Sequence, residues 1–307
     1  MFRHFLTHWA EEYFYRPLAY QRFISYLLSP FALIWCFCAQ LRRALKRPVD
    51  YGVPVISVGN LNIGGSGKTP VSIAIAKNFA KPAIILRGYK RTSKGLVVVS
   101  RYGEILCDVK TSGDEAMLYA QELKNALVIV SEERTKAIQK AKELGAEVVI
   151  LDDGFGKINI KKFDILIRPN PSPANTFCIP SGAYRESIGN YKNADLVLEE
   201  GVNFERIVHV ENAAAKMILL TAIANPARLE RYLPKSVIGQ KTFADHYSFN
   251  KDELAEILRK SGADSILTTT KDAVKMEGFD LPLSILKLQI KLSSEVMGQI
   301  NSYLARL

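Results

Sequence analysis

The segment Asn62-Ile63-Gly64-Gly65-Ser66-Gly67-Lys68-Thr69 decides the fold. It follows the apolar run Val55–Val58 and precedes a helical stretch from Pro70 to about Phe79, which is the strand–loop–helix context of a P-loop. Backbone N–H groups in such a loop, together with the N-terminus of the helix, bind phosphate. Lys68 is expected to reach the terminal phosphates and the Thr69 hydroxyl to bind Mg²⁺. Asn62 stands where a first glycine is usual.

Apolar strands alternate with helical stretches along the rest of the chain, which predicts an α/β fold with a parallel sheet covered by helices on both faces. After residue 201 the same alternation restarts and predicts a second, smaller α/β domain. We therefore expect an N-terminal helical membrane anchor, a P-loop nucleotide-binding domain and a smaller C-terminal domain, at residues 1–50, 51–201 and 202–307.

The N-terminal segment has the composition of a membrane anchor. Residues 1–22 mix aromatic and charged side chains. Residues 23–41 are nearly uncharged, and Pro30 interrupts this apolar run. A basic cluster follows, made of Arg42, Arg43, Lys46 and Arg47. An anchor lying in the interface, with basic side chains facing anionic lipids, is favoured over a spanning helix or a buried helix pair.

Net charge and cysteine content limit the kinds of partner and the cell compartment, but they do not identify a function. The 307 residues are 48% hydrophobic and carry a net charge of +10, which favours anionic partners such as nucleotides, lipid head groups or nucleic acid. The sequence contains no recognisable nucleic-acid recognition motif. The four cysteines are scattered, which predicts reduced thiols in a cytoplasm, and Cys36 and Cys38 are interpreted as small apolar residues.

Three acidic positions are candidates for the chemistry. Asp152 and Asp153 end the apolar run 148–151, and beside a P-loop such residues are typical of the Mg²⁺-binding arm, although an Asp-Gly turn is the alternative. Asp114 opens a predicted helix, where it could accept a hydroxyl proton or, like Ser112, simply cap the helix. His246 is one of four histidines, and a lone histidine is more often structural.

Together these motifs resemble the tetraacyldisaccharide 4′-kinases, the lipid A 4′-kinases. The resemblance runs in order from about residue 50 to 276, and the N-terminal region matches in kind only. The matching segments are 55–61 with the P-loop, Leu86-Arg87-Gly88-Tyr89, Gly113-Asp114-Glu115, Asp152-Asp153-Gly154-Phe155, Pro180-Ser181-Gly182 with Arg185-Glu186, Asn225-Pro226, Phe243-Ala244-Asp245-His246 and Thr270–Lys275.

The resemblance implies an ATP- and Mg²⁺-dependent kinase that phosphorylates the 4′-hydroxyl of a tetraacyldisaccharide 1-phosphate and forms lipid IVA. It also implies a location at the cytoplasmic face of a Gram-negative inner membrane, with neither nucleic acid nor an obligate protein partner. By position, Asp114 is the expected base with His246 as its partner, and Lys68 acts on the phosphates. The remaining roles are metal binding by Thr69, Glu115, Asp152 and Asp153, and substrate binding by Arg185 and Glu186.

Two departures from the family pattern and two competing functions remain open. Gly156-Lys157 stands where the family usually has Gln-His, and Tyr247 follows His246 where a second histidine is frequent. A P-loop kinase for another lipid or sugar is one alternative. A nucleotide-dependent membrane switch is the other, but Ile63 occupies the position of the signature lysine of the membrane-associated ATPase switches.

Overall fold

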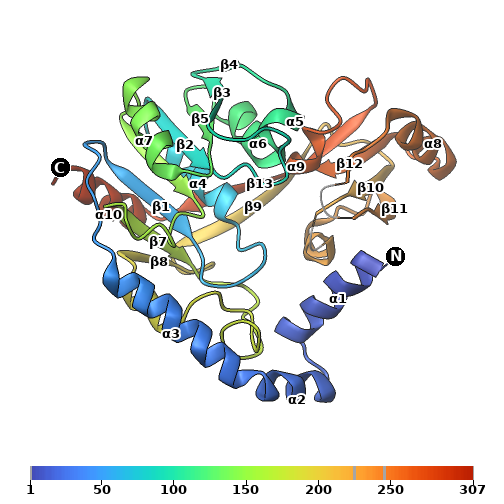
Figure 1. Cartoon of the computed structure of the whole chain (residues 1–307). Helices are drawn as coiled ribbons and strands as arrows, with labels where there is room; N and C mark the ends of the chain where they lie inside the picture. The colour runs from blue at the N-terminus through green and yellow to red at the C-terminus, as the bar shows by residue number, and fades with distance from the viewer. Residues whose placement is uncertain (1, 224–225, 245–246, 307) are drawn as a thin grey trace. The chain divides into compact units, whose positions relative to one another are not determined.

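The computed structural model describes residues 2–223, 226–244 and 247–306 (Figure 1). Two compact units are present, and each is assembled from separate stretches of chain. The first unit contains Met1–Ser72, Glu147–Glu205 and Leu292–Leu307, and the second contains Ile73–Ala146 and Arg206–Lys291. The predicted domain boundaries at residues 50 and 201 follow the order of the chain, and they stay a prediction.

The first unit is built on four parallel strands in the order β6-β1-β7-β8. Their bounds are β1 (Val55–Gly59), β6 (Val148–Asp152), β7 (Phe163–Ile167) and β8 (Leu196–Leu198). Every residue of the first three strands is buried, as expected for parallel strands that are covered on both faces. Val58 lies in register with Asp152, so the carboxyl ends of β1 and β6 meet at one edge of the sheet.

The C-terminal helix α10 (Ser294–Leu304) packs on these strands (Figure 1). The Tyr303 hydroxyl donates a hydrogen bond to the Val55 carbonyl oxygen at 3.2 Å, and its ring lies 5.1 Å from that of Phe163. Burial raises the pKa of Tyr303, so the phenol stays neutral and keeps donating. The end of the chain is thereby fixed to the start of the strand that leads into the P-loop.

The N-terminal segment forms three successive helices, α1 (Phe2–Tyr15), α2 (Ala19–Leu27) and α3 (Ser29–Leu45), drawn in blue in Figure 1. Pro30 lies in the first turn of α3, where its missing N–H costs nothing, so the chain bends between α2 and α3 and continues as a helix. Within the described residues, no single helix has the length and apolarity to cross a bilayer. The pair α2 and α3, bent by 53°, reaches both criteria only when taken together.

One sheet portion of the second unit includes an antiparallel hairpin at residues 97–105. Strand β2 (Pro82–Leu86) pairs in parallel with β5 (Leu127–Val130), and β3 (Val97–Arg101) runs antiparallel to β5 and to β4 (Glu104–Ile105). Helices pack against these strands or connect them, namely α5 (Val109–Ser112), α6 (Asp114–Glu122) and α7 (Arg134–Glu143). The elements that the alternation of apolar and polar residues predicts here are confirmed within a few residues.

The second sheet of this unit has the strand order β11-β10-β12-β13-β9. Its elements are β9 (Phe204–Glu211), β10 (Met217–Thr221), η2 (Pro226–Tyr232), β11 (Val237–Thr242), α8 (Lys251–Ser261), β12 (Ser265–Thr269), α9 (Thr270–Ala273) and β13 (Leu283–Leu292). The segment η2 forms a 3₁₀ helix rather than an α-helix. Edge strand β11 has only two large apolar residues, Val237 and Ile238, and most of its residues are exposed, so it lacks the apolar run that indicates a buried strand. The α/β fold class with a large, mainly parallel sheet is confirmed.

Candidate functional site

The P-loop follows β1 directly and ends where α4 (Lys68–Ala76) begins, so Lys68 is the first residue of that helix. Gly64 and Gly67 have φ values of 107° and 87°, in the left-handed region that favours glycine. The glycines are therefore required by the backbone path of the loop. The predicted strand–loop–helix context of Asn62–Thr69 is confirmed.

Asn62, which departs from the common P-loop pattern, has a structural task. Its buried side chain donates hydrogen bonds to the Tyr15 hydroxyl and to the Ile63 carbonyl, both at 3.0 Å. Tyr15 in turn donates to the Ile63 carbonyl at 2.9 Å. A glycine at position 62 could make none of the side-chain contacts, so Asn62 anchors the start of the loop to helix α1.

The two aspartates lie at the carboxyl end of β6, next to the P-loop. Asp152 is buried, and Asp153 has a φ of 53° while its N–H donates to the Val58 carbonyl at 2.9 Å. A non-glycine residue in this conformation is uncommon and is often found at functional sites. The Asp153 carboxylate lies 3.9 Å from the Lys68 ammonium, so the two predicted site residues are brought together.

Arg185 links these parts of the site through one side chain. It donates to both carboxylate oxygens of Asp153 at 2.9 and 3.0 Å, and to the Asn60 side-chain oxygen at 2.6 Å. The same Asn60 oxygen accepts a hydrogen bond from Lys68 at 3.1 Å. Burial alone lowers the pKa of Arg185, but the hydrogen bonds and charge of Asp153 outweigh it and raise that pKa.

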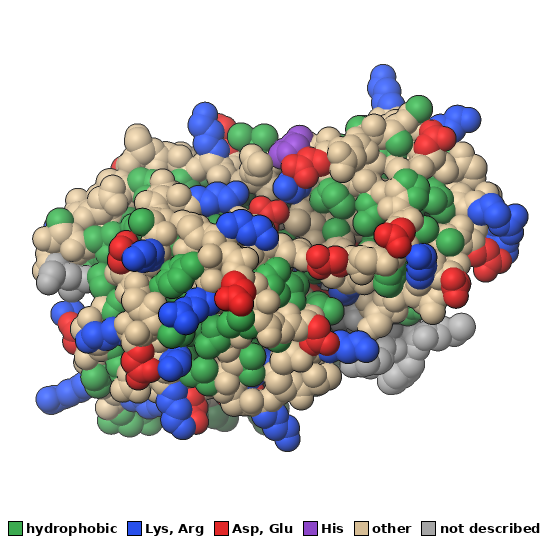
Figure 2. All heavy atoms as spheres, turned by 90° about the horizontal axis from the view of Figure 1, so that it is seen from above, with side chains coloured by type: hydrophobic (Ala, Val, Ile, Leu, Met, Phe, Trp, Pro, Cys, Tyr) green, Lys and Arg blue, Asp and Glu red, His purple; other side chains and the backbone are tan. Residues whose placement is uncertain are grey.

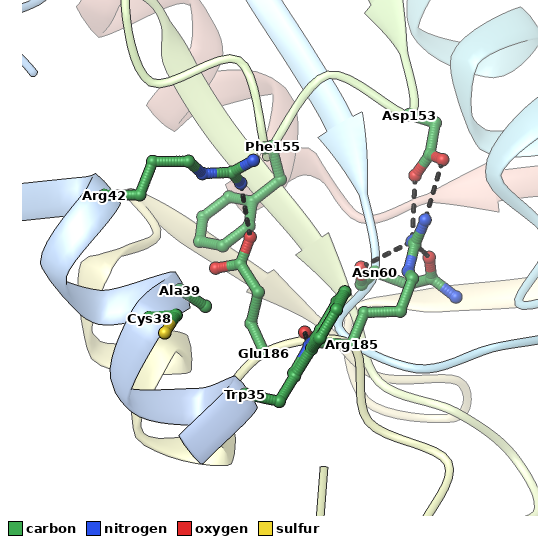
Figure 3. A pocket seen from close by; sticks show the side chains of 10 residues that line it. Trp35, Cys38, Ala39, Arg42, Asn60, Asp153, Phe155, Arg185 and Glu186 are labelled. Atoms are coloured by element: carbon green, nitrogen blue, oxygen red, sulfur yellow. Dashed lines mark hydrogen bonds and ion pairs between the residues drawn. The ribbon is translucent and has the colours of Figure 1, made fainter. Parts of the chain in front are cut away.

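A pocket of about 350 Å³ opens beside this network (Figure 3). Its lining comes from α3, from the loops after β1 and β6 and from the 185–186 segment, as Trp35, Cys38, Ala39, Arg42, Asn60, Asp153, Phe155, Gly156, Arg185 and Glu186. The Trp35 indole donates to the Arg185 carbonyl at 2.8 Å. Glu186 pairs with Arg43 at 2.8 Å and accepts from Asn190 at 2.9 Å. Both predicted substrate residues, Arg185 and Glu186, therefore line this pocket.

Asp114 and Glu115 belong to the second unit, where they open helix α6. The N-cap of α6 is Gly113, and Ser112 lies in α5 with its hydroxyl bonded to the Asp108 carbonyl. The interpretation of Asp114 or Ser112 as the helix cap is therefore wrong. Asp114 instead lies 3.8 Å from the Lys275 ammonium, and Glu115 lies 3.7 Å from that of Lys271.

Lys275 is itself held by a buried acid. Asp272 is fully buried and lies 2.8 Å from the Lys275 ammonium. Its other oxygen accepts hydrogen bonds from the Thr221 hydroxyl at 2.7 Å and from the Ala222 N–H at 2.9 Å. The segment Thr270–Lys275, which only the resemblance indicates, thus supplies a lysine to each of the two acidic residues in the first turn of α6.

The contacts above do not test the roles of several predicted site residues. Asn225, Asp245 and His246 are outside the described residues. Within the described part of the chain, no group of three His, Cys, Asp or Glu side chains forms a ready metal site. The predicted metal roles of Thr69, Glu115, Asp152 and Asp153 stay predictions.

The prediction that the cysteines are reduced thiols is wrong for Cys36 and Cys178. Cys36 of α3 forms a disulfide with Cys178, across a sequence separation of 142 residues, while Cys38 and Cys107 are free.

Three further site residues were not predicted from the sequence, namely Asn60, Arg43 and Tyr15. Each of them contacts a site residue that is distant in the sequence, so no local pattern distinguishes it from an ordinary surface or core residue.

A phosphate-binding loop after β1, with an acidic pair at the end of the neighbouring parallel strand, defines a P-loop nucleotide-binding protein of the phosphotransferase type. Residues 24–305 match the family model of tetraacyldisaccharide-1-P 4′-kinase. The chain belongs to this family, and the prediction of a kinase of lipid A synthesis is confirmed.

Named relatives agree with this assignment. The chain is 46% identical to the tetraacyldisaccharide 4′-kinase of Aliarcobacter butzleri over 96% of both chains. It is 46% identical to that of Helicobacter pylori, over 96% of this chain and 94% of the relative. The crystal structure of LpxK from Aquifex aeolicus in complex with ATP matches with a TM-score of 0.76 and 27% identity, over 91% of this chain and 98% of that one.

The loop that carries Asp152 and Asp153 offers a test with a matched control. A Cβ at Gly154 would lie 2.6 Å from the Leu151 Cβ and 3.1 Å from the Ser57 Cβ, whereas one at Gly156 would meet nothing closer than 3.9 Å. Gly154→Ala should therefore lower the free energy of unfolding by about 1–3 kcal/mol and weaken binding of a nucleoside triphosphate. Gly156→Ala should change neither. Equal denaturation curves for the two variants would contradict this geometry.

Proposed function

We propose that this chain transfers the γ-phosphate of ATP to the 4′-hydroxyl of a tetraacyldisaccharide 1-phosphate, forming lipid IVA, at its P-loop. The observation that carries the proposal is the convergence of Lys68, Asp153 and Arg185 around Asn60, beside a pocket. The loop supplies backbone N–H groups for the phosphates, and α4 adds the positive end of its dipole. Lys68 then neutralises charge that develops on the transferred group.

The residues in the first unit fit a magnesium ion. Thr69 lies in the first turn of α4, and Asp152 and Asp153 end β6, so all three present oxygen atoms. Mg²⁺ prefers oxygen ligands, and it usually keeps several waters and takes only one or two carboxylates together with substrate phosphates. When bound, the ion would neutralise charge on the β- and γ-phosphates. Both Asp153 oxygens accept hydrogen bonds from Arg185, so these bonds must loosen if Asp153 is to bind the ion. Glu115, which belongs to the second unit, also stays a proposed metal ligand.

Asp114 is the proposed general base and His246 its partner. The Asp114 carboxylate lies 3.8 Å from the Lys275 ammonium, and a carboxylate held in place near the acceptor can take the proton of its hydroxyl. In the proposed pair, a hydrogen-bonded imidazole orients this carboxylate and shares the proton. Because Lys275 is paired with Asp272 as well, its position does not depend on Asp114.

The acceptor is a lipid, and the N-terminal helices are the proposed membrane contact. Large apolar side chains are exposed on α2 and α3, among them Phe23, Tyr26, Leu27, Phe31, Leu33, Ile34 and Phe37. A soluble surface rarely gathers so many, and such patches mark interaction or membrane surfaces. The basic cluster that follows suits the anionic cytoplasmic leaflet of an inner membrane, and the named relatives come from Gram-negative bacteria.

One face of the molecule carries charges of both signs. On the face drawn in Figure 2, the described Lys and Arg side chains alternate with Asp and Glu and form no continuous basic stripe. A stripe of one sign is the usual electrostatic footprint of a nucleic-acid-binding protein. The positive net charge is therefore better matched to the phosphates of ATP and of the lipid head groups.

Mass spectrometry of the lipid after incubation with ATP and Mg²⁺ tests the proposed function. The unaltered chain should add one phosphate at the 4′ position, and Lys68→Ala should lower the rate by about 10²-fold or more. The variant should keep its melting temperature, because the Lys68 side chain is partly exposed and its ammonium contacts the polar groups of Asn60 and Asp153. ATP hydrolysis with no phosphorylated lipid would instead favour a nucleotide-dependent switch.

The proposed pair of Asp114 and His246 predicts non-additive substitutions. Asp114→Asn should lower kcat by about 10²–10⁴-fold with ATP affinity retained, because the base is lost. The double variant with His246→Ala should be little worse than the more damaging single variant. If the two effects multiply instead, the residues act independently. Melting temperatures recorded in parallel separate loss of chemistry from loss of stability.

The membrane contact is tested by changing only its exposed apolar face. Leu33 and Phe37, one helical turn apart on α3, are 70% and 68% exposed. Leu33→Asp with Phe37→Asp should lower binding to anionic vesicles by about 100-fold, since each apolar side chain contributes about 1.5–3 kcal/mol when buried. A matched control is Val202→Asp with Ile238→Asp, two exposed apolar positions elsewhere. Equal sedimentation of both variants with vesicles would place the contact elsewhere.

A further inference from the structure

The pocket beside the P-loop has a second end that the roles proposed above leave without a ligand. In Figure 3, Asp153, Asn60 and Arg185 lie on one side of the pocket, whereas Arg42 approaches Glu186 and Phe155 from helix α3 on the other side. The first side contains Asp153, which is proposed to bind Mg²⁺ next to the transferred phosphate, and its two neighbours Asn60 and Arg185. The second side, formed by Arg42, Phe155, Gly156 and Glu186, is called the α3 end below.

The charges at the α3 end leave one surplus cation. Glu186 is already neutralised by Arg43, whose guanidinium lies 2.8 Å from one carboxylate oxygen and stacks 4.2 Å above the Phe155 ring. Arg42 lies 3.9 Å from the other oxygen, beyond hydrogen-bond distance, and its side chain is 55% exposed. Two guanidinium groups therefore face one carboxylate, and Arg42 can turn to an incoming anion while Glu186 keeps its partner.

Gly156 provides the room for that anion. A Cβ at position 156 would lie 3.9 Å from the Glu186 carboxylate and 4.0 Å from the Arg42 guanidinium. One methyl group fits there, but a longer side chain would extend toward the space between Arg42 and Glu186. The absence of a side chain at this position keeps the guanidinium accessible from the pocket.

We propose that the α3 end binds the 1-phosphate of the acceptor through Arg42. This inference rests on the proposed function, because the family's acceptor carries a 1-phosphate at the far side of the disaccharide from the 4′-hydroxyl. A planar guanidinium is well suited to bind phosphate with two parallel hydrogen bonds. With the 4′-hydroxyl directed toward Lys68 and Asp153, the 1-phosphate is directed to the opposite end.

The surroundings of Arg42 suit an amphiphilic ligand. The same helix presents Trp35 and Cys38 to the pocket and carries exposed apolar residues such as Ile34 and Phe37 beside them. Acyl chains can therefore lie along α3 while the phosphate enters the pocket next to Arg42. A free sugar phosphate would use the cation alone, so both the lipid and its phosphate contribute to recognition.

The test compares two acceptors in neutral detergent micelles, the disaccharide lipid with its 1-phosphate and the same lipid without it. Arg42→Ala should raise KM for the phosphorylated lipid by about 10–100-fold, with kcat nearly unchanged and with KM for the dephosphorylated lipid unchanged. Arg42→Lys should recover part of the loss, because an ammonium keeps the charge but not the two parallel hydrogen bonds. Arg306→Ala, which removes an exposed arginine from the C-terminal end, serves as the charge-matched control.

Equilibrium binding of the two lipids, measured on the same variants, separates this inference from the proposed function. The unaltered chain should bind the phosphorylated lipid more tightly, and Arg42→Ala should lose that preference. Preferential binding without turnover would overturn the kinase assignment and leave the phosphate site in place. Equal binding of both lipids by the unaltered chain, or equal weakening of both by Arg42→Ala, would overturn the phosphate site whatever the turnover.

Discussion

The Arg185 guanidinium joins the parts of the candidate site in the first unit. It binds both oxygens of Asp153 at the end of β6 and the side chain of Asn60 at the end of β1, and Asn60 in turn accepts from Lys68. A rigid, planar group with several donors is well suited to satisfy a carboxylate and an amide at once. The phosphate-binding loop, the acidic pair and the pocket are thus held in one arrangement by a single side chain.

The parts of this site that could be predicted from the sequence are those that local physical chemistry determines. Glycines at 64 and 67 reveal the loop because its backbone needs positive φ values, and apolar runs reveal β1 and β6 because both are buried on two faces. The meeting of Lys68 and Asp153 then follows from the rule that parallel strands end at the same edge. Lys275 near Asp114 had only a resemblance to indicate it, since nothing local pairs these two residues.

The parts that could not be predicted depend on contacts between distant segments. Trp35 with Arg185, Arg43 with Glu186 and Cys36 with Cys178 join residues more than 140 positions apart. The sequence of α3 favours an interfacial helix over a buried helix or part of a spanning segment, but it does not indicate which residues of the chain the helix contacts. Its polar contacts therefore appear only once the fold places the 178–190 segment against it. The role of Asn62 could not be predicted for the same reason, because it depends on a hydrogen bond to Tyr15 of α1.

These contacts also bear on how the N-terminal helices can meet a membrane. Trp35 and Arg43 of α3 donate to the Arg185 carbonyl and the Glu186 carboxylate, so one side of the helix is committed to the site. A helix that crossed a bilayer would have to withdraw both groups and leave Glu186 without its cation, which is costly for a nearly buried carboxylate. A helix lying in the interface can keep these contacts and insert only its opposite, apolar side. In the proposed interfacial arrangement, the same helix would hold the pocket in shape and present it to lipid.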